Sequence, residues 1–170
     1  MDTFAAFALC SEAPHRELMD HLPIQRNTPV ITSFMWLSII ATGAFFIIGG
    51  FIQMETAFLG GTTPAEISTV FFAAFVITAV WNGINCRALD GKMPPFFKGN
   101  PTFFAVMGFI VLAQILIVQY GGLVFGTVPL TLNEWVTIIV VSASVLVVGF
   151  GIRVVYHQFR DRIDSLMPGA

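Results

Sequence analysis

One acidic residue lies inside a short apolar stretch at the start of this sequence. Asp2 is the single charged residue of the segment MDTFAAFALC. An ionisable side chain inside a membrane is costly, so its presence there suggests a function. Hard cations such as calcium are bound by carboxylate, amide and carbonyl oxygens, which makes Asp2 a candidate cation ligand. From the residues alone, the alternative is a polar side chain at a solvated chain end.

Two amide side chains form a second candidate site. Asn82 and Asn85, in WNGINCR, are three residues apart, which places them on one face of a helix. They could line an ion path or clamp a neighbouring helix. The alternative is ordinary interhelical hydrogen bonding or capping of a helix end. Ser142 and Ser144 flank a small alanine, and this spacing indicates a close helix contact rather than a site.

Several other chemistries have no support in the sequence. It contains no phosphate-binding loop of the GxxxxGK[ST] type and no His or Cys set with metal-ligand spacing. His15 and His21 lie in a proline-rich loop and His157 in the tail, so none pairs with a credible nucleophile. Cys10 and Cys86 are predicted to be free thiols. With a net charge of −2, the chain has no basic surface for nucleic acid.

The elements that must position these residues are membrane helices. The sequence is 56% hydrophobic and 11% charged, whereas soluble domains carry about 25% charged residues. A membrane helix needs about 20 apolar residues, and the segments 34–52, 67–86, 102–120 and 134–152 each qualify. Residues 1–10 would extend only about 15 Å as a helix, which is half a membrane. The fold class predicted is all-α: a polytopic membrane helix bundle with four full spans and an N-terminal half-helix stub.

The basic residues predict the orientation of this bundle. All eight Lys and Arg residues lie in the loop 11–33, in the stretch 87–101 or in the tail 153–170. The two other loops, 53–66 and 121–133, contain none. Because basic loops remain on the cytoplasmic side, both basic loops and the C-terminus are predicted to be cytoplasmic. The tail has apolar residues at helical spacing, which predicts an amphipathic helix on the membrane surface.

Several ordered motifs together resemble one family. MDTFAAFAL, SEAPHRELM and PIQRNTPVIT resemble the end of the sixth membrane helix of calcium-pumping P-type ATPases and the loop that follows it. WNGINCRALDGK resembles the Asn-x-Ile-Asn-x-Arg stretch that ends their eighth helix. FFKGNPTFFAVMGFIVLAQILIVQYGGLVFGTVPLTLNEW is similar to their ninth helix and the loop into the tenth. The plasma-membrane type, with its bacterial relatives, fits best, and the likeness covers essentially the whole chain.

The resemblance implies roles for particular residues. In this family the sixth-helix Asp is a calcium ligand, which implies that role for Asp2. The Asn that accompanies it, one turn earlier, would precede Met1. The position of the family's eighth-helix Glu or Gln is held here by Ala79, which cannot coordinate an ion. The resemblance therefore implies a pump with one calcium site, in which the second span is scaffold.

The resemblance also implies which parts of a pump this chain would lack by itself. The phosphorylated Asp and the nucleotide and actuator domains, with their ATP and magnesium, would lie upstream. The chain is expected to be a C-terminal membrane-domain fragment that braces the ion-carrying helices in the plasma membrane. Its partners would be the remainder of the P-type ATPase and the lipid bilayer, and by itself it would not pump. The alternatives are an independent four-helix channel or regulatory subunit, and a pump remnant without function.

Overall fold

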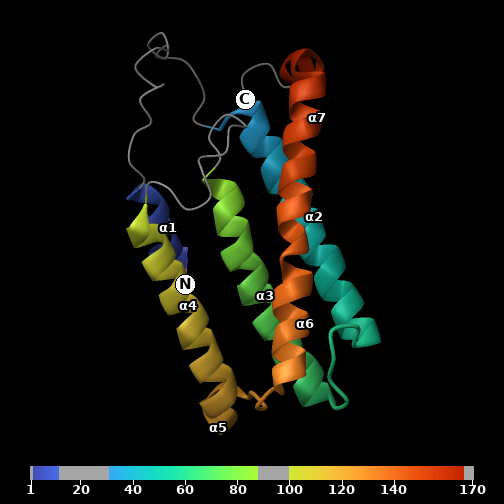
Figure 1. Cartoon of the computed structure of the whole chain (residues 1–170). Coiled ribbons are helices and arrows are strands. Elements are labelled where there is room, and N and C mark those ends of the chain that lie inside the picture. Colours follow the sequence, from blue (N-terminus) through green and yellow to red (C-terminus); the bar gives the residue numbers. More distant parts are fainter. Residues whose placement is uncertain (1, 12–30, 88–99, 167–170) are drawn as a thin grey trace.

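The computed structural model describes residues 2–11, 31–87 and 100–166 (Figure 1). All regular secondary structure in this part of the chain is helical. Its helices are α1 (Asp2–Cys10), α2 (Ser33–Thr56), α3 (Pro64–Cys86), α4 (Pro101–Tyr120), α5 (Gly122–Phe125), α6 (Leu132–Ser142) and α7 (Ser144–Leu166). Four stretches are long and apolar enough to cross a membrane: α2, α3, α4 and the α6–α7 pair as far as Phe159. The predicted all-α membrane bundle with four spans and a short first helix is confirmed.

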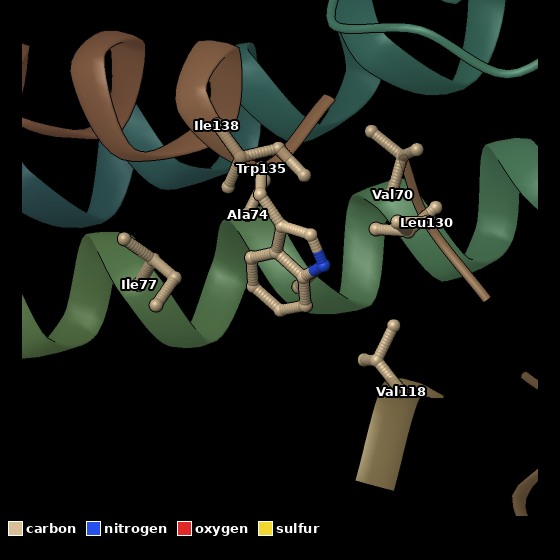
Figure 2. Close-up of a cluster of buried hydrophobic side chains, with 8 residues drawn as sticks. Val70, Ala74, Ile77, Val118, Leu130, Trp135 and Ile138 are labelled. Carbon is tan, nitrogen blue, oxygen red and sulfur yellow. The ribbon is translucent and has the colours of Figure 1, made fainter. Parts of the chain in front are cut away.

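Helix α3 is the centre of the bundle. It packs against α1, α2, α4, α6 and α7. Half of its membrane window is buried, whereas only 6% of the window of α2 is buried. One apolar cluster joins α3 to α4 and α6 around Trp135 (Figure 2), and another joins α3 to α1 and α4 around Phe103. Helix α3 therefore contacts every other long helix, while α2 also packs directly on α7 and α1 on α4.

Two helices begin before their apolar segments because polar residues cap them. Thr63 accepts a hydrogen bond from the backbone N–H of Glu66, while the Glu66 carboxylate accepts one from the backbone of Thr63. Thr131 and Glu134 form the same capping box at the start of α6. Capping boxes satisfy backbone donors that the helix itself leaves unpaired. As a result, α3 begins at Pro64 and α6 at Leu132, ahead of the hydropathy-based positions 67 and 134.

The fourth span, Leu132–Phe159, contains a turn between two helices. Helix α6 ends at Ser142, and α7 begins at Ser144. The Ser144 hydroxyl donates to the carbonyl of Val141 at 2.6 Å, and serine bonds of this kind compete with the helix ladder. Ser142, in contrast, is buried and donates to the carbonyl of Ala74 on α3 at 3.5 Å. The serine pair thus makes a close helix contact and also marks the break.

The last helix continues beyond the predicted end of the fourth span at 152. Helix α7 reaches Leu166, with a non-helical backbone at Phe159 (φ −118°, ψ 17°). Val155 and Phe159 of the predicted amphipathic tail are exposed. The side chains of Ile163 and Leu166 lie outside the described residues, so the amphipathic surface remains a prediction.

Polar side chains tie together the end of the bundle where α2 ends and α3 begins. Gln53 is only 1% exposed; its amide donates to the carbonyl of Gly60 at 3.1 Å and accepts from the N–H of Leu59 at 2.7 Å. Thr69 of α3 accepts from the N–H of Val128 at 3.1 Å. Buried backbone groups without water must find protein partners, and these side chains supply them.

Candidate functional site

Helix α1, which carries Asp2, is held against α4 by apolar packing and by a polar clasp. Ala8 is completely buried, and the ring of Phe4 lies 6.0 Å from that of Phe109 on α4. The Asn100 amide donates to the carbonyl of Ala8 at 3.3 Å and to the Ser11 hydroxyl at 3.1 Å. These two bonds, which we call the clasp, fix the end of α1 beside the start of α4.

The clasp sets the depth of Asp2 in the bundle. Helix α1 begins at Asp2 and ends at Cys10. Eight residues of helix extend about 12 Å, so the Asp2 backbone lies that far along the axis from the clasp. This distance approaches half of a hydrocarbon core about 30 Å thick. The side chain of Asp2 lies outside the described residues, and its role as a ligand remains a prediction.

Asn85, the second predicted site residue, clamps α3 to α7. Its amide nitrogen donates to the carbonyl of Val145 at 2.9 Å and approaches Asn82 Oδ1 at 3.4 Å. The Asn82 amide in turn lies 3.9 Å from the sulfur of Cys86. The structure therefore brings the pair together on one helix face, and Asn85 makes an interhelical hydrogen bond. A role in lining an ion path remains a prediction.

Two residues of α7 complete this clamp. Gly149 is buried beneath Asn85, and a Cβ atom at position 149 would overlap the Asn85 amide. One turn later, a guanidinium nitrogen of Arg153 donates to Asn85 Oδ1 at 3.2 Å. Arg153 is only 9% exposed, and its cation lies near the C-terminal end of α3, where the helix dipole favours positive charge.

The sequence patterns assign neither of these α7 residues to the site. In the sequence, Arg153 stands out only as a basic residue that predicts orientation. The available signal is spacing: Gly149 and Arg153 are four residues apart, which places a small residue and a long donor on one helix face. That signal does not show which other helix the face contacts.

No cluster of protein ligands for a metal ion is found in the described segments. Among residues 2–11, 31–87 and 100–166, no group of three or more His, Cys, Asp or Glu side chains could hold one. Ala79, at the position that corresponds by motif register to the resembled family's eighth-helix Glu or Gln, lies partly buried in α3 with a methyl side chain.

Comparison with known proteins decides the family. Residues 1–155 match the family described as "Cation transporting ATPase, C-terminus". The chain belongs to this family. The cation-transporting ATPase resemblance expected from the motifs of the sixth, eighth and ninth helices is thereby confirmed.

Relatives of this ATPase region include calcium pumps from several organisms. Calcium-transporting ATPase PAT1 of Dictyostelium discoideum is 36% identical over 90% of the chain, which covers 15% of that relative. Plasma membrane calcium-transporting ATPase mca-1 of Caenorhabditis elegans is 34% identical over 88% of the chain, with 13% of its own length covered. Calcium-transporting ATPase 2, plasma membrane-type, of Arabidopsis thaliana is 31% identical over 91% of the chain, which covers 16% of that relative. The chain thus spans about 15% of such a relative.

Proposed function

We propose that this ATPase region is the membrane-embedded C-terminal part of an ATP-driven calcium pump. In this proposal Asp2 contributes a carboxylate to the calcium site, and α2 to α7 brace the helices that carry the ion. The observation that carries the proposal is the similarity to calcium-transporting ATPases over about 90% of the chain. Because the chain spans only about 15% of that relative, ATP hydrolysis with magnesium is assigned to the remainder of the pump.

The packing of α1 supports a bracing role. The clasp and the buried Ala8 hold the helix of Asp2 in a fixed position against α4. Ion coordination requires ligands that are held in place by surrounding structure. A helix that carries one ligand and is fixed in this way would resist displacement when the ion binds or leaves.

Several polar side chains inside the spans also support a scaffold. Thr78 donates to the carbonyl of Ala74 at 2.7 Å, and Gln119 donates to the carbonyl of Leu130 at 2.8 Å. Asn85 is likewise occupied by its bonds to α7. Ala79 offers no oxygen ligand from its side chain. We therefore assign α3 a structural role and infer that the pump carries one calcium ion per cycle.

The proposed orientation follows from the charged loops. The loop 11–33, the stretch 87–101 and the C-terminus would face the cytoplasm, because they hold every basic residue of the chain. In a pump they would face the catalytic domains, whether these belong to the same polypeptide or to a separate one. Calcium would be the transported ion, although manganese shares its oxygen ligands.

Transport measurements test the role of Asp2. ATP-dependent uptake of radioactive calcium would be followed in vesicles from cells that express the chain together with the rest of the ATPase. Asp2→Asn removes the charge that attracts calcium, and uptake is expected to fall to background. Glu55→Gln, at an exposed position on the other end of the bundle, is the matched control and should leave uptake unchanged. Uptake by the Asp2→Asn pump equal to that of the wild type would contradict the ligand assignment.

Omission of the chain tests the pump assignment itself. If the upstream ATPase transports calcium equally well without residues 1–170, the chain is an independent protein or a remnant. If transport requires the chain but not the Asp2 carboxylate, the bracing role stands and the ligand role fails.

A further inference from the structure

Exposed apolar side chains lie where α4 ends and the one-turn helix α5 follows. Tyr120 is 83% exposed, Leu123 104%, Val124 84% and Phe125 59%. We call α5 together with Tyr120 the tip. The sequence from residue 101 to residue 133 contains no charged residue, so no charge lies beside the tip along the chain. Large apolar side chains that are exposed together indicate an interaction surface.

The chain that follows the tip is tied to the bundle, so the tip is held outside it. Thr127 and Leu130 are buried, and the Thr127 hydroxyl donates to the carbonyl of Ile117 at 3.1 Å. Gly122 (φ +40°) and Gly126 (φ +65°) have the left-handed backbone that favours glycine, and they mark the start and the C-cap of α5. The turn thus packs one part of this connection inward and presents the side chains of α5 outward.

The backbone of the tip is hydrogen-bonded within the protein. The five consecutive N–H groups from Val124 to Val128 all have protein acceptors. The first two donate to the carbonyl of Gly121, the next two to that of Gly122, and the last to Thr69 Oγ1. The next residue, Pro129, has no N–H group to satisfy. Unpaired backbone groups are costly in lipid, where no water replaces the missing partner, so this backbone is compatible with an apolar environment.

The tip lies at the depth of a membrane surface. Helix α4 has 20 residues and extends about 30 Å, which is the thickness of the hydrocarbon core. Figure 1 shows α5 at the same end of the bundle as the starts of α3 and α6, whose first turns contain Glu66 and Glu134. Carboxylates are costly inside the hydrocarbon, so this end of the bundle is at its boundary. Tyrosine favours this same region of a bilayer.

These observations favour lipid over a protein as the partner of the tip. A protein–protein interface typically includes about one hydrogen bond per 100–200 Å², and a polar rim surrounds its core. The tip has apolar side chains, paired N–H groups and no neighbouring charge in the sequence. The boundary between the lipid glycerol groups and the acyl chains requires no more than this from a protein surface.

We propose that α5 inserts its apolar side chains into the interfacial region of the leaflet at this end of the bundle and so anchors the end of α4. The partner is the lipid surface itself, whatever the charge of its headgroups. In the proposed orientation this is the non-cytoplasmic leaflet. The proposal depends on membrane insertion and not on calcium transport.

A nitroxide probe on the tip tests the proposal. The full chain, with its natural cysteines replaced, would be reconstituted in phosphatidylcholine nanodiscs and labelled at Leu123→Cys or Val124→Cys. Power-saturation electron paramagnetic resonance compares collisions with oxygen, which concentrates in lipid, and with a nickel chelate, which stays in water. Both labels are expected to collide severalfold more with oxygen. Ala65→Cys, at an exposed position beside Glu66 at the same end of the bundle, is the matched control and should show the reverse.

A pair of charge variants separates insertion of the tip from simple proximity to lipid. Leu123→Asp combined with Val124→Asp should move the tip into water, so that a label at Phe125→Cys loses its excess of oxygen collisions. Ala65→Asp adds a carboxylate at the same end and should leave that label unchanged. Leu123 and Val124 are almost fully exposed, so their replacement removes little packing, and circular dichroism checks the fold.

Three outcomes would overturn the proposal. The first is an excess of nickel collisions at positions 123 and 124 in nanodiscs, which places the tip in water. The second is dipolar broadening between labels, which assigns the tip to contact with a second copy of the chain. The third is found when the chain is assembled with the rest of the ATPase: few collisions with either reagent would show that protein covers the tip.

Discussion

At the scale of single residues, several polar side chains in the described bundle link neighbouring helices. Asn85 is the clearest case, because it bonds to the backbone of α7 at Val145 and to the side chain of Arg153. The Asn85 amide reaches that backbone because position 149 is a glycine and leaves room for it. The contact depends on a small residue on one helix and an amide on the other, as is common between membrane helices.

Gly149→Ala is therefore expected to destabilise the chain. The added methyl group would overlap Asn85, and overpacking of this kind typically costs about 1–3 kcal/mol. Gly151→Ala is the control, since a Cβ atom at position 151 of the same helix meets nothing within 4 Å and should change stability by less than about 0.5 kcal/mol. The measurement is unfolding of the purified chain in detergent micelles, followed by circular dichroism.

A double mutant tests whether the overlap with Asn85 causes the loss of stability in Gly149→Ala. In an Asn85→Ala background the amide is absent, so Gly149→Ala should cost much less than it does in the wild type. Equal costs in the two backgrounds would show that the methyl group disturbs something other than Asn85.

At the scale of elements, the clasp links a helix end to a helix start. Asn100 accepts a hydrogen bond from the N–H of Phe103 at 2.9 Å and so caps α4, while its amide nitrogen bonds to the end of α1. One side chain thus satisfies orphan groups of two helices that are about 90 residues apart in sequence. Asn100 therefore links the end of α1 to the start of α4, beside the apolar contacts that Ala8 and Phe4 make.

Two substitutions at position 100 separate the capping of α4 from the attachment of α1. Asn100→Asp keeps an acceptor for the cap of α4 but cannot donate to Ala8, so only α1 should loosen. Asn100→Ala removes both functions and should cost about 1 kcal/mol more through the lost cap. Amide hydrogen exchange is the measurement, with faster exchange expected in α1 for both variants and in the first turn of α4 for Asn100→Ala alone. Unchanged exchange in α1 would show that the apolar contacts of Ala8 and Phe4 suffice.

At the scale of the whole molecule, the helix ends that flank the basic segments lie together. The end of α3, the starts of α2 and α4, and the end of α7 are at one end of the bundle (Figure 1). The turns between α2 and α3 and between α4 and α6, which contain no basic residue, lie at the other. The arrangement of the helices is thus compatible with the orientation that the charges predict.

Thiol labelling tests this orientation. Cys10 and Cys86 are both exposed, and they lie at the ends of α1 and α3 next to the basic segments. In intact cells a membrane-impermeant maleimide should leave both unmodified and should label them after permeabilisation. In a chain without these cysteines, Phe58→Cys, at a 63% exposed position of the α2–α3 turn, should show the opposite behaviour. Labelling of the natural cysteines in intact cells would reverse the proposed topology.

Much of the architecture could be predicted from the sequence because the bilayer imposes it. Four apolar segments of sufficient length had to be helices, and Asn100 with Pro101 is a start signal that α4 uses. The break at Ala143 was not predicted, because Ser142 and Ser144 have the same hydropathy whether their hydroxyls bond to α3 or to their own helix. Helices α3 and α6 begin at Pro64 and Leu132, ahead of the apolar segments, because capping residues are polar and fall outside an apolar window.

By itself, then, the sequence determined the number of spans, the family and the predicted orientation, because each depends on composition, order or charge along the chain. Only the tertiary structure decided that Asn85 meets Gly149 and Arg153, that Asn100 links α1 to α4, and that the apolar side chains of α5 lie outside the bundle. The physical reason is that lipid is as apolar as the inside of a helix bundle. A membrane helix therefore does not reveal in its hydropathy which face will pack, and partners about 60 to 90 residues apart are identified only when the helices are placed together.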